Sequence, residues 1–278
     1  MRRAILAFVF LFGCSSGPDT GDGSAGTDSG TSDDGASMDD GASMDDGASG
    51  QDSGPPCTAN ADKIGLTTRT AKGKNYLSYA PSTYMRGKPM PLVVALHGYG
   101  DTPGNYLNAM WKANADAKGF VVIAPEGSSA IGNGLFTYNS SDRTQILAEM
   151  DDVRPCYDLE PKKTILNGFS AGGIMAYWVG MKDAKRFSGI GINAADLGSA
   201  ENGLNGGAKL IPAPWTIPVS HFHGDQDTNF PIMFAKAGID RLTAAGHMTY
   251  WHPFSGGHTA SAAMAAQEYD DLISSSSP

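Results

Sequence analysis

The chain has 278 residues, of which 41% are hydrophobic, and this is enough for one substantial globular domain. A wholly disordered or fibrous protein is therefore excluded. With three cysteines and no CxxC or Cys/His pair at zinc-ligand spacing, no metal site is expected. The net charge is −9, but residues 15–56 hold ten aspartates and no lysine or arginine. Residues 57–278 carry only −1, without the clustered cations that a nucleic-acid partner requires.

Residues 1–13 have the layout of a lipoprotein signal peptide. Two arginines precede an apolar run, Ala4 to Phe12, that is too short to span a bilayer as a helix. The run leads into Leu-Phe-Gly-Cys, which resembles a bacterial lipobox, so Cys14 is the predicted lipidation site. The alternative is a generic cleavable signal with an incidental cysteine. Because Ser15 follows, we expect an exported protein at the outer membrane or cell surface, or outside the cell, with no membrane contact besides this anchor.

Residues 14–56 are predicted to be a disordered tether that follows the lipidated cysteine. From residue 15 to 56 there are ten glycines, nine serines and ten aspartates, and no aromatic residue, so the segment cannot bury a core. The hexapeptide Gly-Ala-Ser-Met-Asp-Asp occurs twice, at 35–40 and 41–46. Calcium binding is the alternative reading, but the ligand spacing and closing glutamate of an EF-hand loop are missing.

From Cys57 onward, short β-branched runs bounded by glycine or proline alternate with helix-like stretches. We expect buried parallel strands at 92–96, 120–124, 164–166 and 188–192, and later strands near 217–222 and 247–252. Helices are expected near 105–118, 144–158, 170–184, 232–245 and 259–273. This alternation predicts that residues 57–278 form an α/β domain, a doubly wound, mostly parallel sheet with helices on both faces.

A nucleophile motif lies between a predicted strand and a predicted helix. Gly168-Phe169-Ser170-Ala171-Gly172 directly follows the third strand run and opens an apolar helix. A strand that turns sharply into a helix strains the nucleophile's backbone and needs small flanking residues. Ser170 is therefore the predicted nucleophile.

A serine needs a base and an acid, which we expect in loops after later strands. His258 lies in a Ser-Gly-Gly-His loop after the last strand, and it is the predicted base. Asp225 and Asp227 follow the strand before it, and spacing alone does not decide between them; Asp196 is a more distant candidate. The order Ser170, aspartate, His258 is that of the α/β-hydrolases.

Four other histidines are assigned no chemistry, and a fifth is given a supporting role. His97 is expected to hold a loop by hydrogen bonds. His221 and His223 are expected to be buried with their ring nitrogens satisfied, and His247 and His252 have no distinguishing context.

An oxyanion hole needs two backbone N–H donors, one after the nucleophile and one in the loop after an earlier strand. Ala171 and Tyr99 occupy these places. Tyr99 lies in His97-Gly98-Tyr99-Gly100, whose third glycine is misplaced for a dinucleotide-binding fingerprint.

Four motifs follow one another along the chain: Leu-His-Gly at 96–98, Gly-Phe-Ser-Ala-Gly-Gly-Ile-Met at 168–175, His-Gly-Asp-Gln-Asp at 223–227 and Gly-Gly-His-Thr at 256–259. Together they resemble the polyhydroxybutyrate depolymerase and feruloyl esterase group of α/β-hydrolases. The resemblance implies serine-dependent hydrolysis of carboxylic esters without a cofactor, with Asp227 as the acid. It leaves the substrate open among hydroxyalkanoate, feruloyl and other short acyl esters, small or polymeric. Many relatives continue the His258 loop with Trp-Pro where this chain has Thr259-Ala260-Ser261, so a wall of the acyl site is expected to differ.

Two segments are candidate walls of the substrate site: residues 127–142, with Phe136 and Tyr138, and residues 196–215, which end at Trp215. Ordinary loop packing is the alternative for both. In an exported domain, Cys57 and Cys156 could form a disulfide.

The sequence therefore predicts an exported serine esterase that acts through an acyl-enzyme. A serine peptidase on the same fold and a catalytically inactive surface-binding protein are the competing hypotheses. The oligomeric state is left open.

Overall fold

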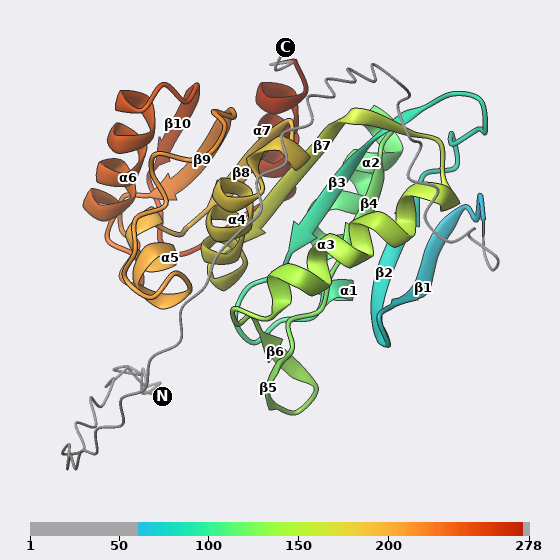
Figure 1. Ribbon diagram of the computed structural model, residues 1–278, viewed down its shortest axis with the longest axis horizontal. Helices are drawn as coiled ribbons and strands as arrows, with labels where there is room; N and C mark the ends of the chain where they lie inside the picture. Colours follow the sequence, from blue (N-terminus) through green and yellow to red (C-terminus); the bar gives the residue numbers. More distant parts are fainter. Residues whose placement is uncertain (1–60, 275–278) are drawn as a thin grey trace, which may run out of the picture. The chain divides into compact units, whose positions relative to one another are not determined.

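An eight-stranded sheet runs through residues 61–274, the part of the chain that the computed structural model describes (Figure 1). In spatial order its strands are β1 (Gly65–Ala71), β2 (Lys74–Ala80), β4 (Val121–Ala124), β3 (Met90–Leu96), β7 (Leu159–Phe169), β8 (Gly189–Asn193), β9 (Val219–Gly224) and β10 (Thr249–Phe254). Neighbouring strands from β4 to β10 are parallel, whereas β2 is antiparallel to both of its neighbours, β1 and β4. A separate hairpin consists of β5 (Ser129–Gly132) and β6 (Leu135–Thr137).

Helices cover both faces of this sheet, as Figure 1 shows. One face packs against α3 (Asp142–Val153), α4 (Ala171–Lys182), α5 (Leu197–Gly203) and α6 (Ile232–Ala244). The other packs against α1 (Pro103–Tyr106), the π-helical turn Leu107–Trp111, α2 (Lys112–Lys118) and α7 (Ala262–Ser274). Short 3-10 turns follow α3 and α4 at Arg154–Cys156 and Ala184–Arg186. The predicted fold class, a doubly wound and mostly parallel sheet, is confirmed.

Strand β3 explains the two cores. Its side chains alternate across the sheet, because successive residues of a strand point to opposite faces. Leu92, Val94 and Leu96 enter one core, and Val93 and Ala95 enter the other. Since both faces are covered, the strand reads as one continuous apolar run.

Strands β1 and β2, helix α5 and the β5–β6 hairpin were not predicted. In β1 the buried face carries Thr67 and Arg69, whereas Leu66 is exposed, so the usual apolar alternation is absent. Arg69 is satisfied by the Oγ of Ser78 at 2.7 Å and the hydroxyl of Tyr157 at 3.0 Å. The buried polar group is stable because these partners replace its water.

The predicted signal peptide, the lipidated Cys14, the tether and Cys57 lie outside the described residues, and these expectations remain predictions. None of the helices between residues 61 and 274 combines the length and apolar character that crossing a membrane would require.

Candidate active site

Ser170 lies at the point where β7 ends and α4 begins, with φ 56° and ψ −117°. A side-chain-bearing residue is strained in this region, as expected at a nucleophile elbow. The two flanking positions require glycine because the neighbouring backbone lies too close for a side chain. A Cβ on Gly168 would lie 2.1 Å from the carbonyl oxygen of Gly172, and one on Gly172 would lie 2.2 Å from that of Leu96. The small residues of the motif therefore allow helix and strand to meet this tightly.

The structure brings the three predicted catalytic side chains together in one hydrogen-bonded chain. Nε2 of His258 lies 2.9 Å from Oγ of Ser170, and its Nδ1 lies 2.8 Å from Oδ2 of Asp227. Because a carboxylate accepts from Nδ1–H, Nε2 is left as the acceptor for the serine hydroxyl. Ser170 and Asp227 are buried, while His258 is partly exposed. This arrangement can transfer a proton from the serine to the imidazole.

The loop that follows β9 separates the two candidate acids. Oδ1 of Asp227 accepts from the backbone N–H of Asn229 at 2.8 Å and of Phe230 at 2.9 Å, which directs Oδ2 toward His258. Oδ1 of Asp225 instead accepts from the N–H of Gly256 at 3.0 Å and ties this loop to the His258 loop. Asp196 caps α5 by accepting from Ser199. Of the three candidate acids, only Asp227 is hydrogen-bonded to the imidazole of His258.

His97 supports the loop that carries Tyr99. Its Nδ1 donates to the carbonyl of Gly98 at 2.8 Å, and its Nε2 accepts from the N–H of Gly127 at 3.3 Å. Burial lowers the pKa of His97, which favours the neutral ring that these two bonds require. The loop after β3 is thereby fastened to the loop after β4.

His221 and His223 form a buried relay whose tautomers are determined by its ends. Nε2 of His223 is 2.7 Å from the carbonyl oxygen of Phe230, which can only accept. Nδ1 of His223 must then accept from Nε2 of His221 at 3.1 Å, and Nδ1 of His221 from the hydroxyl of Tyr177 at 2.8 Å. Burial lowers the pKa of His221 well below its usual value. The relay links α4, behind the nucleophile, to the loop of Asp227.

The predicted oxyanion donors belong to segments next to the nucleophile. Ala171 is the first residue of α4. Its backbone N–H is therefore one of the first four in the helix, which have no acceptor within their own helix. In the loop before α1, the N–H of Gly100 donates to Phe136 and that of Asp101 to Gly98. Within residues 61–274, no backbone carbonyl accepts a hydrogen bond from the N–H of Tyr99. Their role in binding an oxyanion remains a prediction.

The candidate wall at residues 127–142 lies beside the loop of Tyr99, but of its two aromatic residues Tyr138 does not face the site. The β5–β6 hairpin pairs with the Tyr99 loop, because the N–H of Gly100 donates to the carbonyl of Phe136 at 3.1 Å. Tyr138 was expected to line the site, but it is buried, and its hydroxyl donates to Pro125 and accepts from the N–H of His97. The hairpin has a signal that sequence reasoning overlooked: Asn133-Gly134, both at positive φ, form the turn.

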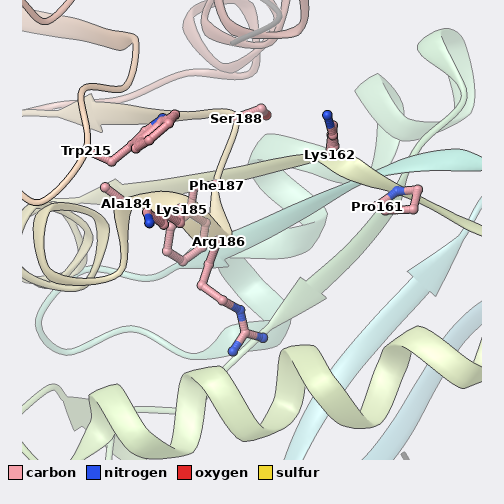
Figure 2. Close-up of a pocket in the computed structure, with 8 residues that line it drawn as sticks. All are labelled: Pro161, Lys162, Ala184, Lys185, Arg186, Phe187, Ser188 and Trp215. Atoms are coloured by element: carbon pink, nitrogen blue, oxygen red, sulfur yellow. The ribbon is translucent and has the colours of Figure 1, made fainter. Parts of the chain in front are cut away.

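The other candidate wall ends away from the triad. Trp215 lines a cavity of about 270 Å³ with residues 184–188, as Figure 2 shows. Pro161 and Lys162, early in β7, also line this cavity, whereas Ser170 follows the opposite end of that strand. Trp215 is therefore excluded from the walls of the candidate active site.

Cys156 is disulfide-bonded. Because Cys57 lies outside the described residues, the pairing of these two cysteines remains a prediction.

Comparison with known proteins shows similarity to ester hydrolases. Residues 142–274 match the family model described as Phospholipase/Carboxylesterase. The chain is 30% identical over 160 residues to a bifunctional acetylxylan esterase/xylanase of Neocallimastix patriciarum, covering 56% of this chain and 22% of that protein. It is 28% identical over 139 residues to feruloyl esterase C of Emericella nidulans, covering 48% of this chain and 50% of that protein. The chain thus spans half or less of the length of these two relatives.

Among solved structures, a substrate-bound fluorophosphonate-binding serine hydrolase of Staphylococcus aureus superimposes with a TM-score of 0.57 at 15% identity. The superposition covers 77% of this chain and 98% of that structure. At this identity the likeness establishes the fold. Together with the strand order, it shows that the chain has the α/β-hydrolase fold that its motifs predict. The family match adds that residues 142–274 resemble carboxylic ester hydrolases.

Proposed function

We propose that this protein is a serine carboxylic ester hydrolase that works through an acyl-enzyme. The observation that carries the proposal is the hydrogen-bonded chain from Ser170 through His258 to Asp227, with Ser170 at a strained strand–helix junction. A strained, small-flanked serine with a base and an oriented acid is the arrangement that acyl transfer requires.

In the first half-reaction, Oγ of Ser170 attacks the ester carbonyl while Nε2 of His258 takes the hydroxyl proton. Asp227 keeps the imidazole in the Nδ1–H tautomer and stabilises the imidazolium that forms. The N–H groups of Tyr99 and Ala171 receive the oxyanion. The C–O bond to the alcohol then breaks, and the alcohol leaves with the proton from His258. Water enters with His258 as base, and hydrolysis of the acyl-enzyme regenerates Ser170.

The surroundings of the triad support an apolar acyl group. The ring of Phe230 stacks on that of His258 with centroids 5.6 Å apart. The ring of Phe169 also packs against the imidazole, with centroids 5.0 Å apart. Met233 and Phe234, at the start of α6, are exposed and follow Phe230 within four residues. Exposed apolar side chains gathered next to a reactive group are typical of a ligand surface.

The loop of Tyr99 and the β5–β6 hairpin also carry exposed apolar side chains. Tyr99 and Ile131 are both exposed, and Cδ1 of Ile131 lies 3.6 Å from where a Cβ on Gly100 would be. We call Tyr99, Ile131, Met233 and Phe234 the apolar rim. The two cavities of about 270 and 300 Å³ have no triad residue in their lining. A reactive group with an apolar rim beside it suits hydroxyalkanoate, feruloyl or other short acyl esters, including esters carried by a larger molecule.

The test is a fluorophosphonate probe on the purified full-length chain, with intact mass and peptide mapping, beside hydrolysis of p-nitrophenyl acetate, p-nitrophenyl butyrate and methyl ferulate. The expected result is one adduct on Ser170 with turnover, and neither in Ser170→Ala. Comparable rates on a matched amide would favour a peptidase. A folded protein with no adduct and no turnover would contradict the proposal and favour a binding protein.

Export and anchoring at Cys14 are proposed from the residues of the first segment alone. Cys14→Ser is expected to move the protein from the membrane fraction to the soluble fraction of its host. An unchanged distribution would contradict the anchor and leave the esterase proposal unaffected.

A further inference from the structure

A fully buried carboxyl group that the proposed reaction does not use lies behind the nucleophile strand. Glu268 projects from α7 toward the sheet, where it meets Asn167 of β7 and Asn193 at the end of β8, all with no exposed surface. Oε2 of Glu268 accepts from Nδ2 of Asn167 at 2.7 Å and from Nδ2 of Asn193 at 3.0 Å. Gly191 leaves room for this contact, because a Cβ there would lie 3.1 Å from the carboxyl group.

The orientation of Asn167 is set by its other neighbours. Its Oδ1 accepts from the hydroxyl of Tyr106 at 2.7 Å and from Nε1 of Trp111 at 3.3 Å, and both groups can donate. The amide nitrogen must therefore face Glu268. With two N–H donors on Oε2, that oxygen is occupied as an acceptor.

Two atoms of this cluster are left without a partner among the described residues: Oε1 of Glu268 and Oδ1 of Asn193. Both accept when the carboxyl group is ionised, so neither can satisfy the other. They belong to two side chains that the Nδ2-to-Oε2 bond already joins. A single proton on Oε1 would turn it into a donor and close a second bond between the same two side chains, which removes both deficits.

The charged surroundings of Glu268 offer no alternative to the proton. Burial is the largest cause that raises the pKa of Glu268 well above its usual value, and the nearby Asp271 raises it further. Hydrogen bonds from Asn193, from the backbone N–H of Ile192 and from Asn167 act to lower the pKa but do not offset the burial. No lysine or arginine within residues 61–274 forms an ion pair with it. Asn167, Asn193 and Tyr106 face it as neutral groups.

Another buried glutamate shows what the opposite case requires. Glu201 also has no exposed side chain, but Arg241 binds both its oxygens at 2.6 and 3.0 Å, and Lys209 adds a contact at 3.0 Å. Although burial acts to raise the pKa of Glu201, these cations and the N–H of Leu210 lower it to about 2. Glu268 has no ion pair with a lysine or an arginine among residues 61–274.

We propose that Glu268 is a neutral carboxylic acid whose Oε1–H donates to Oδ1 of Asn193, and that this pair positions the nucleophile. The catalytic consequence rests on the proposed function. The carbonyl of Asn193 accepts from the N–H of Ser170 at 2.9 Å, and α7 begins four residues after His258. The cluster thus joins the segment that holds Ser170 to the helix that follows the base.

The protonation state is tested without reference to activity, by the infrared difference spectrum of wild type minus Glu268→Gln near pH 7. The expected result is a carbonyl band of a protonated carboxylic acid that is lost in the variant. A difference spectrum with a carboxylate band in its place would overturn the proposal. This measurement decides the point even if the protein proves not to be an esterase.

The positioning role is tested by kcat and KM for p-nitrophenyl acetate and by the rate of fluorophosphonate labelling of Ser170. In Glu268→Leu, kcat and the labelling rate are expected to fall about 10- to 100-fold with KM little changed, since a small misplacement of a reacting group costs that much. Glu268→Gln should restore both to within about threefold, because its amide can donate where the hydroxyl did. A folded Glu268→Leu variant with wild-type kcat would overturn the role.

Glu201→Gln is the matched control. It removes a buried carboxylate that pairs with cations on α6 and in the loop after α5, so it should lower the melting temperature and leave kcat per folded molecule unchanged. If the fluorophosphonate does not label Ser170 in the wild type, that result contradicts the proposed function and not the positioning role of Glu268.

Discussion

The two edges of the sheet differ in what they offer a ligand. The first part of β7 and the segments that precede β8 and β9 border the cavity of about 270 Å³. In it Trp215 lies beside Lys185, with the lysine nitrogen 5.3 Å from the ring centre. The carboxyl-terminal ends of β7, β9 and β10 are followed by Ser170, Asp227 and His258, and none of these three residues lines either cavity. The cavity of about 300 Å³ lies beyond the ends of β3 and β4, where Gly104 and Glu126 line it. Neither cavity therefore contains the nucleophile.

The difference teaches that reactive geometry, and not hollow volume, marks the candidate site. Parallel strands bring their carboxyl ends to one edge, so the loops that follow them can converge side chains there. At this edge the backbone is strained at Ser170 and Ala194, with φ of 56° and 50°. Such strain persists only where the surrounding contacts impose it.

The largest expected difference between the edges comes from removing the nucleophile. Ser170→Ala should lower kcat for p-nitrophenyl acetate by at least about 10⁴-fold, because residues of a triad act as a unit. Trp215→Ala, at the other edge, should leave kcat within about twofold. Equal losses in the two variants would break the comparison.

The second contrast lies within one loop. Asp227→Asn should cost about 10⁴-fold in kcat, because an amide in place of the carboxylate disfavours the productive tautomer of His258. Asp225→Asn should cost less than about tenfold, since the side chain contacts only the backbone of Gly256. The reverse ranking in steady-state kinetics would assign the acid to Asp225.

The buried relay should be visible in the pH dependence of stability. The unfolded chain takes up a proton at His221 below about pH 6.5, whereas burial lowers the pKa of the folded residue. Folding therefore loses stability from this residue as the pH falls below about 6.5. Buried acids such as Glu149, with its pKa raised to about 8 mainly by burial, act in the opposite direction, so the wild type alone is ambiguous.

The informative quantity is the difference in unfolding free energy between wild type and His221→Gln. Between pH 6.5 and 5.5 the unfolding free energy of the wild type should fall by about 1 kcal/mol more than that of the variant. Urea denaturation at both pH values measures it. A constant difference would mean that His221 titrates alike in the two states.

The smallest expected effect concerns the apolar rim. Phe234→Ser should lower kcat/KM for p-nitrophenyl butyrate about fivefold more than for the acetate, because the longer acyl chain has more apolar surface to bury. Met248→Ser is the matched control, because Met248 is 54% exposed and Phe234 56%, and Met248 precedes β10 at the amino-terminal edge. An equal change for both esters would exclude Phe234 from the acyl site.

Some of this site could be predicted because its signals are local. The glycines around Ser170 and the loop of His258 lie within a few residues of the groups they serve. Tyr138 shows where such reasoning ends. An aromatic residue in a loop suits a substrate wall, but the hydroxyl of Tyr138 forms hydrogen bonds with Pro125 and His97 instead, and both are distant in sequence.

By itself, the sequence determined the order of the parallel strands and the identity of Ser170 and His258, two of the side chains that meet at one edge. These follow from hydrophobic periodicity and from backbone requirements of single turns. Only the tertiary structure decided that Asp227 and not Asp225 contacts His258, that β1 buries Arg69, and that Glu268 faces two asparagines. Each depends on which distant groups replace water around a polar atom, and that choice is made by packing.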